Sequence, residues 1–293
     1  MKEFNIDTLV QKVPNRLVNS HKGVYGKVLI IAGTKGMGGA GILSSEACVF
    51  CGAGLVTLVT HPENVQASLE RNPEVMVSSE KNNTQQNGNK IALCGPGLGE
   101  DNWSEKFFKK FYQYNFKNGL ILDAGALNFL SLLDKNSFVN HTKLVLTPHP
   151  GEAAKLLKTS NNEIQKNRPK AAKEISKIFN ADVILKGYRT VIYSKSDSAV
   201  LVCNEGGPEL ASGGTGDVLA GLLLALIAQN LSTIDACMLA VAVHARAGLI
   251  FKENVGELGL NASSLIPICR ESVSYTHLRA HETVLELVCR LLL

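Results

Sequence analysis

The chain has 293 residues and a net charge of +4, from 30 Lys and Arg against 26 Asp and Glu. Hydrophobic residues make up 45% and charged residues 19%, a globular composition that excludes general disorder. Basic residues do not cluster with interleaved aromatics, so we expect no nucleic-acid partner.

We expect neither secretion nor a membrane partner. Residues 1–13 are polar and mixed, without the apolar stretch of a secretory signal. The longest apolar runs, 219–228 and 237–243, are shorter than the roughly 20 residues that span a bilayer. The seven cysteines are scattered and odd in number, which is typical of the reducing cytosol and predicts a cytoplasmic protein.

Short β-branched runs alternate with helical stretches along the chain. The expected strands are residues 27–32, 55–60, 91–94, 120–123, 144–147, 183–186, 190–193 and 200–203. The expected helices are residues 42–51, 102–114, 152–157, 169–179, 217–228 and 234–251. This alternation predicts an α/β fold with a mostly parallel central sheet and helices on both faces. The closely spaced strands between residues 183 and 203 predict an antiparallel edge.

We expect one domain, residues 1–269. From about residue 270 the sequence follows no helix–strand rhythm and resembles translated adapter or read-through sequence. Residues 270–293 are therefore interpreted as a non-native tail.

Cys48 and Cys51 form a C-x-x-C pattern inside the expected helix 42–51. No second cysteine pair or nearby histidine completes a metal site, so we interpret them as buried structural thiols.

The strongest chemical motif is A-S-G-G-T-G-D-V-L-A-G, residues 211–221. Gly213, Gly214 and Gly216 crowd the entry to an apolar helix, where backbone N–H groups and the helix dipole favour an anion such as phosphate. Asp217 follows in the first turn and could accept a proton from a substrate hydroxyl while the phosphoryl group is held in line. The alternative is that Asp217 merely caps the helix.

A second motif, L-T-P-H-P-G-E at residues 146–152, ends an expected strand. The flanking prolines hold His149 rigidly in a loop. Glu152 opens the next helix, where it could hold Mg²⁺ through water molecules. The alternative is a proline-bounded turn with a favourable first-turn charge.

Two more glycine loops, 33–41 and 95–99, also follow expected strands. A Rossmann site at 33–41 would need an acidic residue after the second strand, and Thr60-His61-Pro62 stands there instead. No Walker phosphate loop occurs either. Because loops at the carboxyl ends of parallel strands meet at one edge, the four motifs predict a shared crevice that binds phosphate.

Together, K-V-L-I-I-A-G, G-P-G-L-G, L-D-A-x-A-L-N, L-T-P-H-P-G-E, L-K-G and G-G-T-G-D-V-L-A-G resemble one family. They are similar, in family order and over residues 13–267, to the NAD(P)H-hydrate dehydratases, the YjeF carboxy-terminal type within the ribokinase-like superfamily. The combination of P-H-P-G-E with G-G-T-G-D carries the resemblance, since each motif alone is less specific.

The resemblance implies a metabolite-repair reaction: (S)-NADHX or (S)-NADPHX is dehydrated to NADH or NADPH at the expense of ADP or ATP, with Mg²⁺. Phosphorylation turns the ring hydroxyl of the hydrate into a good leaving group, and the ring nitrogen then expels phosphate. Which nucleotide and which hydrate are preferred stays open. The resemblance also implies a homo-oligomer, a tetramer, and a separate epimerase acting upstream.

The family pattern also assigns residues. Asp217 is implied as the catalytic group that activates the hydroxyl. The hydrate is expected near Ala40, Gly97, His149 and Asp217. The nucleotide is expected at Lys186, Gly187, Tyr188, Arg189, Thr190, Gly213, Gly214 and Gly216.

The chain departs from the family at Gly125, which stands where the usual L-D-A-D-A-L motif has a second Asp. Two other hypotheses therefore stay open. One is a ribokinase-like kinase for a vitamin precursor such as hydroxymethylpyrimidine or hydroxyethylthiazole, which would leave P-H-P-G-E unexplained. The other is a nucleotide-binding sensor that has lost catalysis.

Overall fold

The fold is built on one sheet, seen in a computed structural model that describes residues 1–13, 16–79, 91–114, 116–134 and 137–279. Its ten strands run in the order β1-β10-β9-β8-β7-β6-β5-β2-β3-β4. They are β1 Lys2–Phe4, β2 Lys27–Ile31, β3 Leu55–Val59, β4 Met76–Ser78, β5 Ile91–Cys94, β6 Gly119–Leu122, β7 Leu144–Leu146, β8 Asp182–Leu185, β9 Val191–Ser194 and β10 Ala199–Cys203. Neighbours pair in parallel except β8–β9 and β9–β10. The predicted mostly parallel sheet with an antiparallel part is confirmed.

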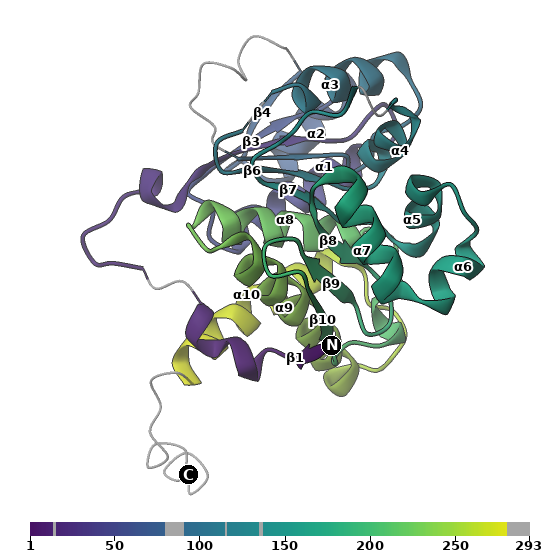
Figure 1. Cartoon of the computed structure of the whole chain (residues 1–293). Coiled ribbons are helices and arrows are strands. Elements are labelled where there is room, and N and C mark those ends of the chain that lie inside the picture. The colour runs from purple at the N-terminus through teal and green to yellow at the C-terminus, as the bar shows by residue number, and fades with distance from the viewer. Residues whose placement is uncertain (14–15, 80–90, 115, 135–136, 280–293) are drawn as a thin grey trace, which may run out of the picture.

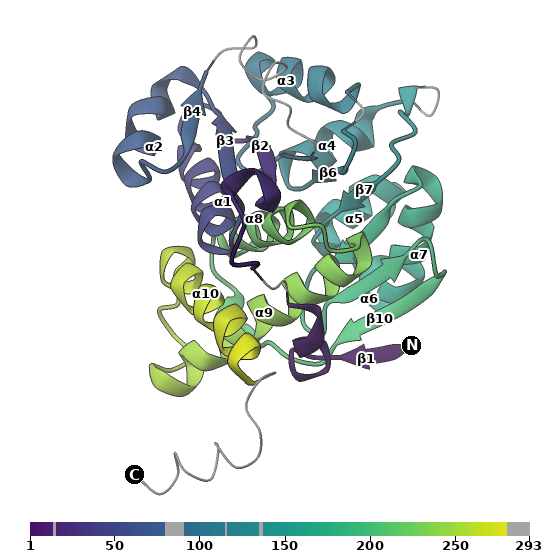
Figure 2. The same cartoon turned by 90° about the vertical axis from the view of Figure 1, so that its left-hand side faces the viewer.

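Helices cover both faces of this sheet (Figures 1 and 2). They are α1 Gly38–Phe50, α2 Val65–Arg71, α3 Asn102–Tyr112, α4 Gly125–Leu132, α5 Pro150–Leu157, α6 Asn161–Lys166, α7 Arg168–Phe179, α8 Thr215–Ala228, α9 Thr233–Asn254 and α10 Ala262–Arg279. Short 3₁₀ segments in the described residues lie at Asp7–Lys12, Lys22–Tyr25, Pro62–Asn64 and Pro208–Leu210.

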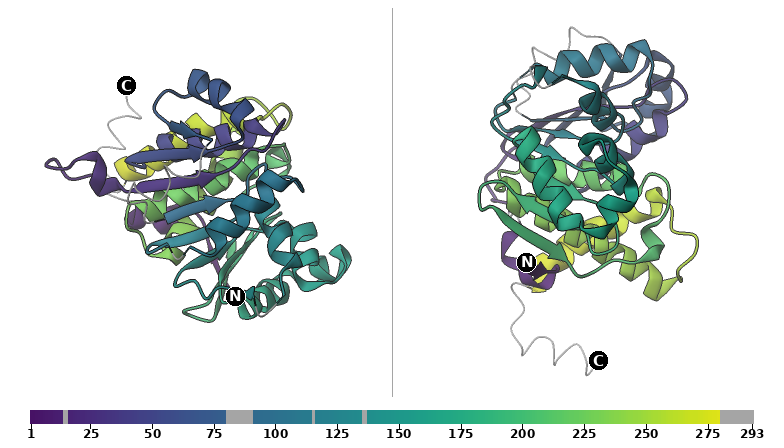
Figure 3. Two further views of the ribbon diagram at one scale, coloured as in Figure 1. Left: turned by 90° about the horizontal axis from the view of Figure 1, so that it is seen from above. Right: turned by 45° about the vertical axis from the view of Figure 1, so that its right-hand side comes forward.

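Successive strand residues point into two separate hydrophobic cores. In β2, Val28 and Ile30 pack with α1, α8, α9 and α10, whereas Leu29 and Ile31 pack with α3, α4, α5, α6 and α7. The view from above separates these layers (Figure 3). Burial on both faces explains why the strands read as continuous apolar runs.

Several boundaries differ from prediction. The helix expected at 42–51 begins at Gly38, so the end of the expected loop 33–41 is helical. Its glycines permit close packing, because a Cβ on Gly41 would lie 3.3 Å from Leu58 Cδ1. The strands β1 and β4 were not predicted: unlike the equally short but fully buried β7, these three-residue strands are partly exposed and show no continuous apolar run.

The last described helix, α10, continues past the expected domain end at residue 269. Cys269 and Ser272 are buried, and Val273 packs against the core beside α8 and α9. Residues 280–293 lie outside the described part, and the division at residue 269 stays a prediction.

Helix α9 is, by length and composition, apolar enough to cross a membrane, and it is longer than the run 237–243 noticed in the sequence. In the structure 67% of its most apolar window is buried. It packs against α8, α10 and the strands β8, β9 and β10, so its apolar surface is used inside the fold.

The C-x-x-C cysteines are buried free thiols on the sheet side of α1, as interpreted. Burial raises the pKa of Cys51 to about 12, so its thiol stays neutral and unreactive.

A close contact between helices α1 and α8 is made by a glycine. A Cβ on Gly221 would lie only 2.1 Å from the Ser44 carbonyl oxygen. We expect Gly221→Ala to lower the free energy of unfolding by about 1–3 kcal/mol, the range for overpacking, as measured by urea denaturation.

Gly39→Ala is the matched control, because Gly39 lies in the first turn of α1 and its Cβ would meet nothing within 4 Å. This variant should leave stability unchanged or raise it by up to about 1 kcal/mol. Equal stability of the two variants would contradict the assigned contact.

Candidate active site

The glycine and proline loops that the sequence singled out lie together at the carboxyl edge of the sheet. The Gly33 N–H donates to the Pro96 carbonyl (2.9 Å), which ties the loop after β2 to the loop after β5. The Gly125 N–H donates to the Gly95 carbonyl (3.2 Å), which ties in the loop after β6. The predicted convergence of these loops is confirmed.

At the centre of this edge lies a buried ion pair. Lys186, just after β8, places its Nζ 2.6 Å from Oδ1 of Asp123, just after β6. The Thr147 hydroxyl donates to the same oxygen (2.8 Å). A Cβ on Gly216 would lie 3.5 Å from the Lys186 Nζ, so the ammonium sits beneath the start of α8. Burial acts to lower the pKa of Lys186, but Asp123 and Glu152 outweigh it and the net pKa is raised.

Asp217 faces this cluster from the first turn of α8. Burial, and next the nearby Asp123 carboxylate, raise its pKa to about 7, although Lys186 opposes them. The cap of α8 is Gly214, with a φ of 88°, and no side chain hydrogen-bonds as a cap there. The simple capping alternative for Asp217 therefore has no support in the contacts.

Two of the residues expected near the hydrate, Ala40 and Gly97, lie on the α1 side of α8. A Cβ on Gly97 would lie 2.8 Å from the Ala40 Cβ, so the loop after β5 touches the first turn of α1. Leu43 lies one turn further along α1. A Cβ placed on Gly214 would lie 2.7 Å from Cδ1 of Leu43 and 3.9 Å from Oδ2 of Asp217. Ala40, Gly97 and Asp217 are thus brought to one side of the crevice.

His149 shapes the start of α5. Its Nδ1 accepts hydrogen bonds from the N–H groups of Gly151 (3.0 Å) and Glu152 (3.3 Å), and Oε2 of Glu152 accepts from the His149 N–H (2.8 Å). These reciprocal hydrogen bonds form a capping box. From the sequence we expected, as the alternative to a metal site, only a proline-bounded turn with a favourable first-turn charge. Because Nδ1 is an acceptor, the neutral ring carries its proton on Nε2, and 57% of the side chain is exposed.

Glu152 is largely buried beside this loop. Burial raises its pKa, although the Lys186 charge opposes the shift. Among the described residues there is no group of three or more His, Cys, Asp or Glu side chains arranged to hold a metal. Any metal contact by Glu152 would therefore rely on water and ligand oxygens.

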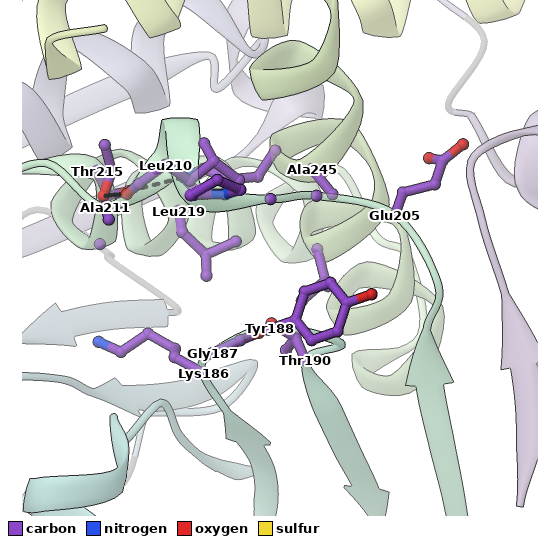
Figure 4. A pocket seen from close by; sticks show the side chains of 16 residues that line it. Lys186, Gly187, Tyr188, Thr190, Glu205, Leu210, Ala211, Thr215, Leu219 and Ala245 are labelled. Atoms are coloured by element: carbon purple, nitrogen blue, oxygen red, sulfur yellow. Dashed lines mark hydrogen bonds between the residues drawn. The ribbon is translucent and has the colours of Figure 1, made fainter. Parts of the chain in front are cut away.

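A cavity of about 480 Å³ opens on the Lys186 side of α8 (Figure 4). Five of the eight expected nucleotide residues line it: Lys186, Gly187, Tyr188, Thr190 and Gly216. Its other end has apolar walls from Leu210, Leu219, Val241 and Ala245. This volume and this mixture of polar and apolar walls suit a small organic ligand with one charged end.

The remaining three expected residues do not line the cavity. The Arg189 guanidinium pairs with Glu3 on β1. Gly213 is exposed and a Cβ there would meet nothing within 4 Å, whereas Gly214 packs against Leu43 and Ala262.

His244 on α9 lines the cavity and was not singled out in the sequence. Burial lowers its pKa to about 4, so the ring is neutral at pH 7. Its Nε2 lies 2.9 Å from the Thr215 carbonyl oxygen, to which it must donate. A lone histidine inside an apolar helix gives no sequence signal for this contact.

The comparisons agree with this geometry. The profile of the family described as NAD(P)H-hydrate dehydratase matches residues 28–270. The chain belongs to this family.

Three relatives place the chain within the family. An ADP-dependent (S)-NAD(P)H-hydrate dehydratase of Neisseria meningitidis is 32% identical over 87% of this chain and 87% of the relative. A bifunctional NAD(P)H-hydrate repair enzyme of Coxiella burnetii is 37% identical over 89% of this chain but 53% of the relative, so the chain spans about half of that protein. A crystal structure of the ADP/ATP-dependent NAD(P)H-hydrate dehydratase of Bacillus subtilis, co-crystallised with ATP and Mg²⁺, has a TM-score of 0.84 and 26% identity, covering 94% of this chain and 98% of the other.

Gly125, the departure from the dehydratase family pattern, has a steric reason in this chain. A Cβ there would lie 2.1 Å from the Leu98 carbonyl oxygen, because the loop after β5 packs directly on the start of α4. Only glycine permits this approach. Asp123 is consequently the single carboxylate of this motif.

The raised pKa of Asp217 predicts a cost in stability. In the unfolded chain the carboxyl ionises near 3.8, whereas in the fold it holds its proton to about 7. The native state binds more protons between these values, so ionisation lowers stability as the pH rises through this window. Above pH 7 we expect Asp217→Asn to raise the melting temperature, by about 2–4 °C for each kcal/mol gained in the free energy of unfolding. Below pH 3.8 the substitution should have no effect.

Asp101→Asn is a control of opposite sign. Burial acts to raise the pKa of Asp101, but hydrogen bonds from Thr34 and Ser104 outweigh it and lower the pKa. This variant should lose stability at neutral pH. A lower melting temperature of Asp217→Asn at pH 8 would refute the assigned electrostatics.

Proposed function

We propose that this protein is a metabolite-repair enzyme that dehydrates (S)-NADHX or (S)-NADPHX to NADH or NADPH, using ADP or ATP. The observation that carries the proposal is the position of Asp217. Its carboxyl group lies between the Ala40–Gly97 flank of the crevice and the Lys186 flank that borders the cavity. A proton acceptor placed between two binding sites suits transfer of a group from one ligand to the other.

The reaction follows from these positions. Asp217 takes the proton of the ring hydroxyl while that oxygen attacks the terminal phosphorus, and the nucleotide leaves as AMP or ADP. The ring nitrogen then expels phosphate with the C–O bond electrons, and loss of a proton from the adjacent carbon restores the ring double bond. Lys186 and the N–H groups at the start of α8 stabilise the charge on the moving phosphoryl group.

Mg²⁺ fits this site as a partner of the nucleotide. Mg²⁺ needs one or two carboxylates and completes its shell with water and phosphate oxygens, so the absence of a three-residue cluster among the described residues does not oppose it. Glu152 would hold the ion through water, and the ion would neutralise phosphate charge. The nucleotide itself would contact Lys186, Gly187, Tyr188, Thr190 and Gly216 by side chain or backbone.

The proposal extends to the surroundings of the enzyme. The relatives of roughly double length are named bifunctional, which supports a separate epimerase that supplies the S epimer to this chain. We also propose a cytoplasmic homo-oligomer, a tetramer, which light scattering of the purified protein would test.

The decisive experiment incubates the protein with (S)-NADHX, Mg²⁺ and either ADP or ATP, and follows the absorbance of reduced nicotinamide. Recovery of NADH together with AMP or ADP and phosphate is expected. Nucleotide binding without recovery would favour the inactive sensor, and phosphorylation of a hydroxymethylpyrimidine or hydroxyethylthiazole alone would favour the vitamin kinase.

We expect Asp217→Asn to lower kcat by about 10²–10⁴-fold while leaving the Kd for nucleotide unchanged, because the amide cannot accept the proton. In the wild type, kcat should rise with pH through a transition near 7, since only the ionised carboxylate is a base.

Asp182→Asn is the matched control. Asp182 is also a buried carboxyl group whose pKa burial raises, but it lies at the opposite edge of the sheet, where it accepts from the Lys195 N–H. Its variant should keep kcat and the pH profile. Retained turnover in Asp217→Asn would remove the general base from this mechanism.

A further inference from the structure

The loop between β8 and β9 borders the cavity through Gly187, Tyr188 and Thr190. Gly187, Tyr188, Arg189 and Thr190 donate no backbone N–H hydrogen bond to any described residue. The φ angles of Gly187 and Arg189 are positive, 135° and 54°. Backbone N–H groups beside a cavity can donate hydrogen bonds to an anion such as phosphate.

Three of the four carbonyl groups of this loop accept hydrogen bonds, that of Thr190 from the Cys203 N–H (3.0 Å). The Thr190 hydroxyl donates to the Gly187 carbonyl (3.0 Å). One guanidinium, that of Arg168, donates from Nη2 to the Leu185 carbonyl (2.9 Å) and from Nη1 to the Tyr188 carbonyl. In a planar trans peptide the C=O and the following N–H point in opposite directions. Fixing the Tyr188 carbonyl on Arg168 therefore directs the Arg189 N–H away from Arg168.

Arg168 reaches this position from the first residue of α7, and a glycine makes room for it. A Cβ on Gly187 would lie 3.2 Å from Nη2 of Arg168, tighter than ordinary contact. Among the described residues, Arg168 has no carboxylate within 4.0 Å. Its charge is therefore not cancelled by an ion pair and adds to the positive potential below the loop.

The contacts of Arg168 do not satisfy the side chain fully. Its Nε is buried without a hydrogen-bond partner. Burying an incompletely paired guanidinium costs free energy, so this placement is poorly explained by stability alone. An arginine is suited to it because its planar fork can reach two carbonyl groups at once, which a lysine cannot.

We propose that Arg168 is a positioning residue for nucleotide binding: it holds the 187–190 loop with its N–H groups open toward the phosphate groups of the nucleotide. This inference rests on the proposed function and adds a residue that does not itself line the cavity. Arg168 acts through the Leu185 and Tyr188 carbonyls and touches neither substrate.

The test measures the Kd for ADP and ATP by calorimetry in the wild type, Arg168→Ala and Arg168→Lys. We expect the Kd of Arg168→Ala to rise about tenfold, equivalent to about 1.4 kcal/mol. The KM for nucleotide should rise in parallel, with kcat at saturation unchanged. Free guanidinium at low millimolar concentration should restore part of the affinity of the alanine variant.

Arg16→Ala is the matched control. Arg16 also donates to a loop carbonyl, that of Gly52 (2.6 Å), and packs over Tyr25, but it does not border the cavity. Its variant should bind nucleotide like the wild type.

A folded Arg168→Ala protein with wild-type Kd, or a loss of affinity that guanidinium does not restore, would overturn the inference while leaving the proposed function intact. If the alanine variant does not fold, Arg168→Lys decides, since it keeps the charge but cannot hold both carbonyls: wild-type affinity there overturns the inference, and weakened affinity supports it. A wild type that binds neither nucleotide would refute the proposed function itself.

Discussion

The ion pair between Lys186 and Asp123 is the constraint on which the rest of the site depends. One buried ammonium lies among the carboxyl groups of Asp123, Glu152 and Asp217, and its field reaches all three. A single positive charge cannot balance three negative ones away from water, so at least one carboxyl must hold its proton to a higher pH. Asp217, which has no hydrogen bond from Lys186 or Thr147, is the group with a pKa raised to about 7. The electrostatics that hold the site together thus also set the basicity that a general base at neutral pH needs.

That cluster explains why anion binding must draw on the backbone. Phosphate groups approaching carboxylates are repelled, and Lys186 is already engaged by Asp123. In the proposed site, the compensating positive potential would come from the start of α8, from the N–H groups of residues 187–190 and from Arg168. Fixed backbone dipoles have an advantage here, since they add positive potential without introducing another ionisable group.

The sequence predicted most of the fold and part of the site, and the limits have physical causes. Buried strands such as β2 and β5 were evident because both faces are covered, while β1 and β4 are partly exposed and show no continuous apolar run. The glycine motif located Asp217, since glycine shapes the backbone locally, whereas the Lys186 loop was expected only from the resemblance to the family. Long-range partners could not be found in this way. Arg168 looks like an ordinary helix-start charge until the chain brings it under Tyr188, and nothing near Gly125 in sequence reveals the Leu98 carbonyl that excludes a side chain there.

The first turn of α8 is where the two halves of the crevice meet. On one flank Gly214 touches Leu43 of α1, one turn from Ala40, and on the other Gly216 lies over Lys186. Asp217 follows directly after both glycines in the chain. In the proposed reaction, a hydrate on the α1 flank and a phosphate on the Lys186 flank would both approach this carboxyl group. The cavity also has apolar walls, formed by residues such as Val241 and Ala245, which suit a nucleotide base. A nucleotide with its base on these walls and its phosphate groups at Lys186 would direct its terminal phosphate toward Asp217, so the apolar and charged walls together would set the orientation of the proposed ligand.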